Sequence, residues 1–284
     1  MTMSCLPRRQ FLELIGLAGT AAALGLPAAA GAAGLSLADV KGSGKLRIGV
    51  EAAYVPFTFR KEGKIVGYDV DLADIFCESL GVKPDIVDTA WAGVIPSLYA
   101  KKFDMIMSAM TYTAERLQRV GFSIPYAEAS QALLIRAADE GSIKGLNDLS
   151  KKVVGIKLGS PGEVLAKKQS EQVKAATGAG FAEIKIFTEH PAAYLSLAQS
   201  KVDAVYNTVP TLAMVLRDQP GKFAMLKGLG ADNWAGIAFR KEDTELQQFI
   251  DGQIMKLKAD GTLGKLQEKW FGFRMTLADK VPAL

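Results

Sequence analysis

The chain alternates short apolar stretches of period two with longer stretches whose apolar residues recur at helical spacing. "KLRIGV" (45–50) is apolar at every second position, as in a strand, and "YDVDLADIFCESL" (68–80) has the spacing of an amphipathic helix. Asp69 is predicted to cap this helix and Gly81 to end it. "DIVDTA", "AGVIPSLYAKK" and "FDMIMSAM" continue the order as strand, helix and strand. This order predicts an α/β fold of mainly parallel sheets flanked by helices.

The alternation restarts after about residue 130, which indicates a second lobe. "SLYAKKFDMI" (97–106) and "SLAQSKVDAV" (196–205) share the pattern S-L-x-x-x-K-apolar-D-x-apolar. Each reads as a helix end, a tight turn and a buried strand, so the two lobes are predicted to have related topology. Ligands of open α/β sheets bind beyond the carboxyl ends of the strands. We therefore expect two matching wall segments, 107–113 and 206–210.

Composition narrows the class of protein. The 284 residues are 49% hydrophobic and carry a formal net charge of only +4, with basic residues scattered along the chain. No nucleic-acid partner is expected from such a distribution. Residues 1–32 contain Arg8-Arg9, an apolar stretch rich in Gly and Ala, and small residues at its end. They are predicted to be a cleaved secretory signal of the twin-arginine type, because the apolar stretch is short for a membrane anchor.

The remaining sulfur and imidazole groups are few. After cleavage Cys77 is the only cysteine and His190 the only histidine. A disulfide within the chain is then excluded, and a thiolate–imidazole pair requires these two residues to meet. Cys77 lies among apolar residues of a predicted helix, which favours an inert buried thiol. No cofactor and no metal are predicted, since a cluster of soft ligands is lacking.

Two segments have the chemistry of an anion site. In "SAMTYTAER" (108–116), Ser108 and Thr111 can donate to an oxyanion, and Arg116 offers a planar pair of donors that suits a carboxylate. In "LGSPGE" (158–163), Ser160 precedes a helix start with free N–H groups. An ordinary surface helix start and an ordinary helix cap are the alternatives for the two segments.

Aromatic and acidic residues follow two other predicted strands. Glu51 and Tyr54 come after the first strand, and Trp91 comes after the second. Aromatic residues at loop tips form the apolar walls of small-molecule clefts, although they also serve as packing residues.

Taken together, the motifs resemble a known family. "LRIGVEAAYVPFTF", "GKIVGYDVDLADIF", "WAGVIPSLYAKKFDMIMSAMT", "TAER", "FSIPY", "LGSPGE" and "KADGTLGKLQEKWFG" are similar, in order, to the polar amino-acid-binding proteins of bacterial ABC importers, solute-binding protein family 3. The resemblance implies the two-lobe periplasmic binding protein fold of type II. Lobe 1 would comprise residues 45–128 plus 235–284, and lobe 2 residues 129–234.

The resemblance also implies roles for individual positions. Arg116 matches the arginine that grips the ligand carboxylate, with Thr111 beside it and Ser160 at the helix start of lobe 2. Tyr54 and Trp91 match the aromatic walls around the ligand side chain. Glu51 matches a position where an acid often meets a ligand amine or a cationic side chain.

Two departures from the family pattern concern the ligand. Ala109 stands where many members have a serine. Lobe 2 commonly supplies an aspartate for the ligand ammonium, and this chain has Asn207 and Thr208 there. Either Glu51 or Glu189 then binds the ammonium, or the ligand is not a standard α-amino acid.

The expected function is therefore periplasmic binding without catalysis. A monomer would bind an amino acid or a related small carboxylate between its lobes and deliver it to an ABC permease of the inner membrane. A cyclohexadienyl dehydratase-like enzyme on the same fold is the alternative, with Glu51 as its acid. A sensor module is a further alternative, but it requires a transmembrane segment, and no stretch after the signal is long enough.

Overall fold

The computed structural model describes residues 34–283 of the chain. The signal peptide predicted for residues 1–32 lies outside these described residues. Among the helices of residues 34–283, none combines the length and the apolar character needed to cross a bilayer.

Lobe 1 is built on a six-stranded sheet of order β5-β1-β6-β14-β7, with β8 beside β14. β1 pairs in parallel with β5 and β6, whereas β14 runs antiparallel to β6, β7 and β8. The strands are β1 (Lys45–Val50), β5 (Lys83–Asp88), β6 (Met105–Thr111), β7 (Gly121–Phe122), β8 (Ala127–Glu128) and β14 (Trp234–Phe239). A small antiparallel sheet adds β2 (Ala53–Tyr54), β3 (Thr58–Lys61) and β4 (Lys64–Val66).

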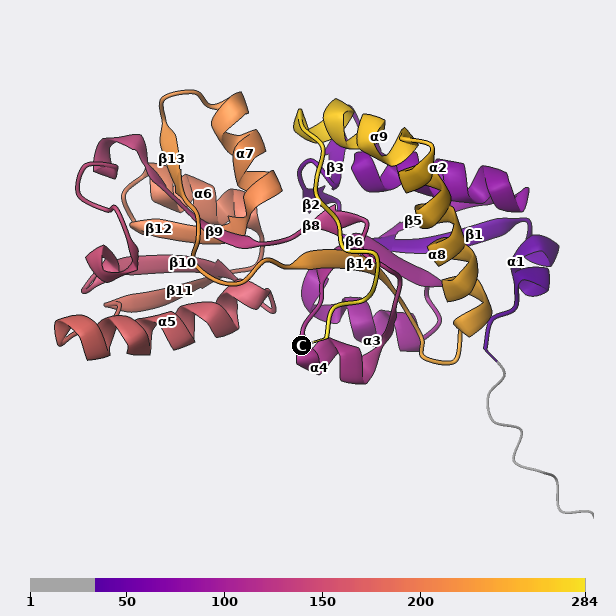
Figure 1. Cartoon of the computed structure of the whole chain (residues 1–284), viewed down its shortest axis with the longest axis horizontal. Coiled ribbons are helices and arrows are strands. Elements are labelled where there is room, and N and C mark those ends of the chain that lie inside the picture. Colours follow the sequence, from indigo (N-terminus) through magenta and orange to yellow (C-terminus); the bar gives the residue numbers. More distant parts are fainter. Residues whose placement is uncertain (1–33, 284) are drawn as a thin grey trace, which may run out of the picture. The chain divides into compact units, whose positions relative to one another are not determined.

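Helices cover both faces of this sheet because its strands are apolar on both sides. Met105 and Met107 of β6 belong to the core under α2, α8 and α9, while Ile106 and Met110 belong to the core under α3. The helices are α1 (Leu37–Ser43), α2 (Tyr68–Leu80), α3 (Val94–Tyr99), α4 (Ala114–Arg119), α8 (Thr244–Ala259) and α9 (Thr262–Phe271), with a 3-10 turn at Trp91–Gly93 (Figure 1).

Lobe 2 has a five-stranded sheet of order β11-β10-β12-β9-β13. β10 pairs in parallel with β11 and β12, and β9 runs antiparallel to β12 and β13. The strands are β9 (Gln131–Arg136), β10 (Val153–Lys157), β11 (Glu183–Phe187), β12 (Ala204–Thr208) and β13 (Phe223–Leu226).

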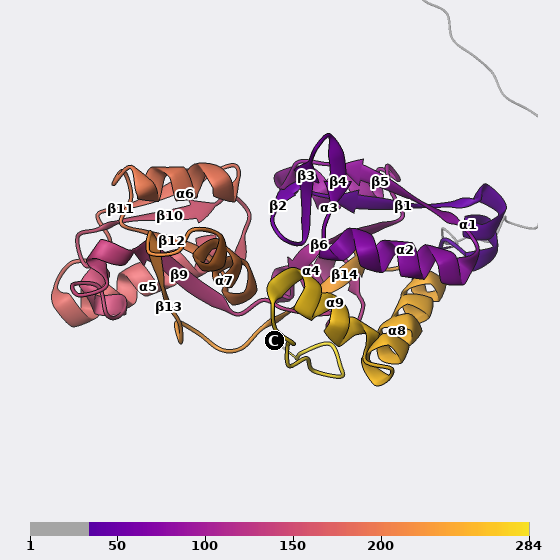
Figure 2. The ribbon, with the colours of Figure 1, turned by 90° about the horizontal axis from the view of Figure 1, so that it is seen from above.

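The helices of lobe 2 also cover two faces. α5 packs on one core of this sheet, and α6 and α7 pack on the other (Figure 2). They are α5 (Pro161–Thr177), α6 (His190–Ala198) and α7 (Val209–Asp218), with 3-10 turns at Ala137–Asp139 and Leu146–Leu149.

The predicted fold class is confirmed, with one refinement: both sheets are mixed. In each sheet three parallel strands are followed by antiparallel ones. In each sheet one antiparallel strand lies next to the three parallel strands: β14 in lobe 1 and β9 in lobe 2. Each of these strands directly follows a connection from the other lobe. The boundary residues predicted for the lobes stay a prediction.

The two connections between the lobes run side by side. One joins β8 to β9 and the other joins β13 to β14. The Ala129 N–H donates to the Asn233 carbonyl oxygen at 2.8 Å, and the Asn233 N–H donates to Ser130 Oγ at 3.1 Å. These bonds pair the two connections at the place where the chain crosses between sheets.

One local prediction is wrong. Helix α2 begins at Tyr68 with Gly67 as its N-cap, so Asp69 does not cap it. Asp69 is instead buried and accepts hydrogen bonds from Thr58 Oγ1 (3.1 Å) and the Tyr126 hydroxyl (2.9 Å). Gly81 does end the helix, in the left-handed conformation, as predicted.

Candidate functional site

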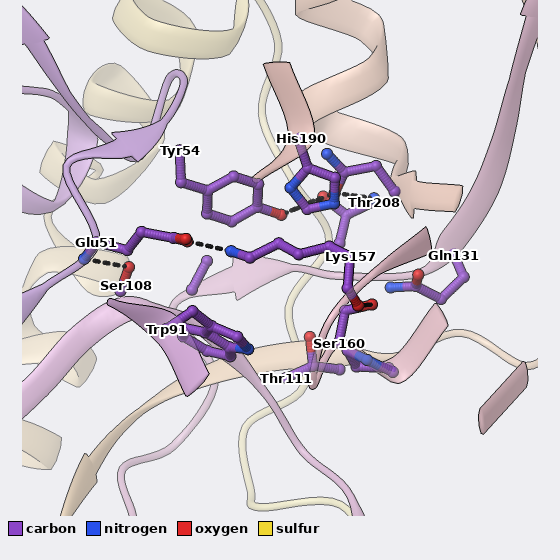
Figure 3. A pocket seen from close by; sticks show the side chains of 13 residues that line it. Glu51, Tyr54, Trp91, Ser108, Thr111, Gln131, Lys157, Ser160, His190 and Thr208 are labelled. Atoms are coloured by element: carbon purple, nitrogen blue, oxygen red, sulfur yellow. Dashed lines mark hydrogen bonds and ion pairs between the residues drawn. The ribbon is translucent and has the colours of Figure 1, made fainter. Parts of the chain in front are cut away.

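The predicted wall segments lie at the carboxyl ends of parallel strands in both lobes, and together they line one pocket (Figure 3). Nine of the ten residues predicted for the site contribute to it. They are Glu51, Tyr54, Trp91, Ser108, Ala109, Thr111, Ser160, Asn207 and Thr208. The structure therefore brings these positions together, and their role in binding a ligand stays a prediction.

The lobe 1 wall is held by hydrogen bonds from its own backbone. Ser108 Oγ accepts from the Glu51 N–H at 3.1 Å, which ties the end of β6 to the end of β1. Ala109 has a φ of 46°, and its N–H donates to the Tyr126 hydroxyl at 2.9 Å. A left-handed residue inside a strand redirects the backbone at the pocket edge, at a cost that the surrounding contacts must offset.

The lobe 2 wall carries no charge at the position where the family commonly has an acid. The Tyr54 hydroxyl lies 3.1 Å from Asn207 Oδ1 and 3.2 Å from Thr208 Oγ1, so it bridges the lobes. Asn207 Oδ1 also accepts from the Thr208 N–H at 2.7 Å. At Asn207 and Thr208 this wall offers neutral acceptors and donors, in agreement with the departure seen in the sequence.

Lys157 is the pocket residue that sequence reasoning missed. It is the last residue of β10, its side chain is 4% exposed, and its ammonium donates to Glu51 Oε2 of lobe 1 (Figure 3). Burial lowers the pKa of Lys157, while the Glu51 carboxylate acts in the opposite direction. Burial likewise raises the pKa of Glu51, opposed by Lys157. A lysine closing the apolar strand "VVGIK" was the available signal.

Three further lining residues were not predicted for the site: Gln131, His190 and Pro161, the first residue of α5. Gln131 begins β9, and His190 begins α6. The His190 ring stacks on Tyr54 at 5.4 Å between centroids, and burial lowers its pKa well below the ordinary value. His190 is therefore a neutral ring in this wall. Among residues 34–283, no group of three or more His, Cys, Asp or Glu side chains is arranged to hold a metal ion.

Arg116 is the predicted residue that does not line the pocket. Its guanidinium lies behind Trp91, with the central carbon 5.1 Å from the ring centroid. Nη1 donates to the Thr111 carbonyl and Nη2 to the Gly159 carbonyl of lobe 2, both at 2.9 Å. Burial lowers the Arg116 pKa to about 10, so the group is charged at neutral pH. A bond to a ligand carboxylate stays a prediction.

In the loop after β10, the Gly159 carbonyl of lobe 2 accepts hydrogen bonds from two side chains of lobe 1. Gly159 has a φ of 67°, and its carbonyl oxygen accepts from Trp91 Nε1 at 3.1 Å as well as from Arg116. The Ser160 hydroxyl donates to the Lys157 carbonyl at 2.7 Å and does not cap α5. The free space among the pocket side chains is about 30 Å³, room for only a few water molecules. A ligand of several atoms therefore requires the lobes or the Lys157 side chain to move.

The model of "Bacterial extracellular solute-binding proteins, family 3" matches residues 46–273. The chain belongs to this family. As a family 3 protein it is 29% identical to the L-cystine-binding protein TcyJ of Escherichia coli over 91% of this chain and 97% of that protein. It is 32% identical to the L-arginine-binding protein of Pseudomonas aeruginosa, over 84% of this chain and 92% of that one.

Solved structures give the same assignment. The P235GK mutant of ArgBP from T. maritima is 36% identical with a TM-score of 0.73, covering 84% of this chain and all of its own. The ancestral amino acid-binding protein AncCDT-1, a precursor of cyclohexadienyl dehydratase, is 33% identical with a TM-score of 0.75, covering 83% of this chain and 99% of its own. The two-lobe fold predicted from the sequence is thereby confirmed.

Proposed function

We propose that this family 3 protein is the substrate-binding component of an ABC importer and binds an amino acid or related small carboxylate between its lobes. The observation that carries the proposal is the pocket itself: two lobes of related topology present their strand ends to it, and nine predicted residues line it. Its relatives are named as binding proteins for cystine, arginine and histidine, which supports an amino acid as the ligand class.

In this proposal the ligand carboxylate binds near Thr111 and Ser160, and Arg116 turns from the Gly159 carbonyl to meet it. The uncharged part of the ligand lies along Tyr54 and Trp91. Contacts to both lobes favour the state in which the lobes meet, so the ligand shifts the population of that state. The protein acts as a monomer in the periplasm and docks on a permease of the inner membrane.

A thermal-shift screen of amino acids, opines, betaines and small carboxylates tests the proposal. A ligand at 100 times its Kd stabilises the folded state by about 2.7 kcal/mol, which raises the melting temperature measurably. Titration calorimetry then gives the affinity of each hit. If no compound of these classes raises the melting temperature, the proposed function is wrong.

The dehydratase alternative is not favoured. Glu51, the acid that this alternative needs, is ion-paired with Lys157. Incubation with prephenate and with arogenate, followed by chromatography for the aromatic product, tests it directly. Steady turnover of either compound would replace the binding role with a catalytic one.

A further inference from the structure

We propose that Lys157 determines specificity, competing with the cationic group of a ligand for Glu51, so that the pocket takes small carboxylates with an uncharged or acidic side chain and rejects arginine, lysine and ornithine. The proposal deepens the proposed function and rests on it. It starts from an ion pair between the lobes: the Lys157 ammonium, from the end of β10, donates to Glu51 Oε2 at the end of β1.

The position of the ammonium carries the proposal. Lys157 Nζ lies 5.0 Å from the centroid of Trp91 and 5.5 Å from that of Tyr54. These are the two aromatic walls, and Figure 3 shows the lysine side chain extending between them toward Glu51. The protein thus places its own cation where aromatic faces and a carboxylate would receive the cation of a ligand.

The charges around the pocket leave a second cation without a partner. Among the described residues that line it, Glu51 is the only acid. Asp88 and Glu189 act on the Glu51 charge, but both are exposed and line an outer hollow that adjoins the pocket at Glu51 and Trp91, where Arg60 pairs with Asp88. A cationic ligand would therefore either displace Lys157, leaving a buried ammonium unpaired, or lie unpaired itself.

Arg116 adds to the same preference. Its guanidinium lies over the ring of Trp91, and the Lys157 ammonium lies over the same ring. Trp91 therefore contacts two cations. The two cations and the single carboxylate leave one excess positive charge. An amino acid with an uncharged side chain is a zwitterion and leaves this excess unchanged, an acidic side chain neutralises it, and a cationic side chain doubles it.

Calorimetry on the parent chain and three variants tests the proposal. The probes are arginine, lysine and ornithine on one side, and glutamine, cystine and glutamate on the other. Lys157→Met keeps the length of the side chain and removes its charge, so it should bind at least one cationic probe about tenfold more tightly than the parent does. Lys157→Arg is the matched control and should keep the rejection.

The gain must depend on Glu51. The double variant Lys157→Met with Glu51→Gln removes the freed carboxylate and should lose the gain of Lys157→Met. Circular dichroism and urea unfolding confirm that each variant is folded. If Lys157→Met does not fold, the comparison of the two probe groups on the parent chain decides alone.

The outcomes separate the two proposals. If the parent binds arginine or lysine within threefold of its best uncharged or acidic probe, the specificity role of Lys157 is overturned and the proposed function stands. An unchanged affinity of folded Lys157→Met for all cationic probes overturns it as well. If neither the parent nor any variant binds any probe or any hit of the thermal-shift screen, the proposed function itself fails, and this inference fails with it.

Discussion

Trp91 contacts both cations near the pocket and a backbone carbonyl of lobe 2. Its indole N–H donates to the Gly159 carbonyl of lobe 2, and Arg116 and Lys157 lie over its ring. The side chain is intermediate in exposure, so part of it faces the solvent or a ligand. The contacts of this one ring therefore involve both lobes and both cations.

Trp91→Ala is expected to weaken ligand binding by roughly 1–3 kcal/mol, because it removes an apolar wall and its contacts with two cations. Calorimetry with the best ligand of the thermal-shift screen measures the change. Trp91→Phe keeps a ring but loses the bond to Gly159, and it should fall between the parent and Trp91→Ala. An unchanged affinity of the alanine variant would make Trp91 a packing residue.

Arg116→Ala is expected to abolish binding of a carboxylate ligand, with a loss of at least about a hundredfold, since a buried charge-assisted pair is removed. The substitution also leaves the carbonyls of Thr111 and Gly159 without this donor. Arg116→Lys keeps the charge but not the planar pair of donors, so it should retain part of the affinity. Binding within threefold of the parent by a folded alanine variant would refute the role.

At the scale of elements, three residues link helix α2 to the pocket edge of β6. The Ala109 N–H donates to the Tyr126 hydroxyl, which in turn donates to Asp69 Oδ1. Asp69 is fully buried, and burial raises its pKa from 3.8 to about 7, opposed by its hydrogen bonds. The titratable Asp69 is thus linked through the Tyr126 hydroxyl to Ala109, the residue in the left-handed conformation.

The raised pKa of Asp69 predicts that stability falls as pH rises. Between the unfolded pKa of about 4 and the folded value of about 7, the folded state holds a proton that the unfolded state has lost. The contribution is complete below pH 4 and is lost as pH rises through 7, with an upper bound of about 4 kcal/mol. Asp69→Asn cannot titrate and should remove this part of the slope.

Urea unfolding of the parent and of Asp69→Asn at pH 5, 6, 7 and 8 tests this prediction. The free-energy difference between the two proteins should shift in favour of the variant as pH rises. Comparing the proteins at each pH cancels the titration of other groups. A constant difference across the range would show that Asp69 keeps an ordinary pKa.

The two segments that share a sequence pattern, 97–106 and 196–205, contain the same tight turn. Lys101 and Ser200 both have positive φ, at 58° and 56°. Asp104 accepts from the Arg47 N–H at the start of β1, and Asp203 accepts from the Val153 N–H at the start of β10. The repeated sequence therefore encodes a repeated connection, in which an aspartate fixes the start of the neighbouring parallel strand.

Asp104→Ala should destabilise the fold more than Asp203→Ala. The Asp104 side chain is 5% exposed and pairs with Arg47, while that of Asp203 is 27% exposed. We expect losses of about 3 and about 1.5 kcal/mol, because Asp104 is itself the more deeply buried acid. Asp104 also lies near two cations, Arg47 and the buried Arg240, whereas Asp203, among the described residues, pairs with Arg136 alone. Urea unfolding measures both, and equal losses would contradict the burial argument. The asparagine variants are controls that keep an acceptor oxygen.

At the scale of the whole molecule, binding depends on contacts that exist only when the lobes meet. The Tyr54 hydroxyl bridge to Asn207 and Thr208 is one of them. Both partners keep other bonds without it, since Asn207 Oδ1 accepts from the Thr208 N–H and Thr208 Oγ1 donates to Thr211. The bridge can therefore be removed with little effect on the fold of either lobe.

Tyr54→Phe should weaken ligand binding up to about tenfold, because the joined state loses one hydrogen bond of about 1 kcal/mol. Faster dissociation should account for most of the loss, as stopped-flow measurements would show. Tyr68→Phe is the matched control: it removes a hydroxyl that bonds to Tyr126 within lobe 1 and should leave affinity unchanged. Equal effects of the two substitutions would contradict a role for the bridge.

The sequence by itself determined the alternation of strands and helices, the paired turns and nine lining residues of the pocket. The alternation and the turns follow from local periodicity. The lining residues follow from the rule that parallel strands end on one edge of a sheet, together with the resemblance of their motifs to the family. Only the tertiary structure decided that Lys157 meets Glu51, 106 residues away, that Arg116 lies behind Trp91, and that Asp69 is buried rather than a cap. Such pairings depend on which side chains face each other across lobes and helices. A local sequence pattern carries no information about contacts between residues so far apart in the chain.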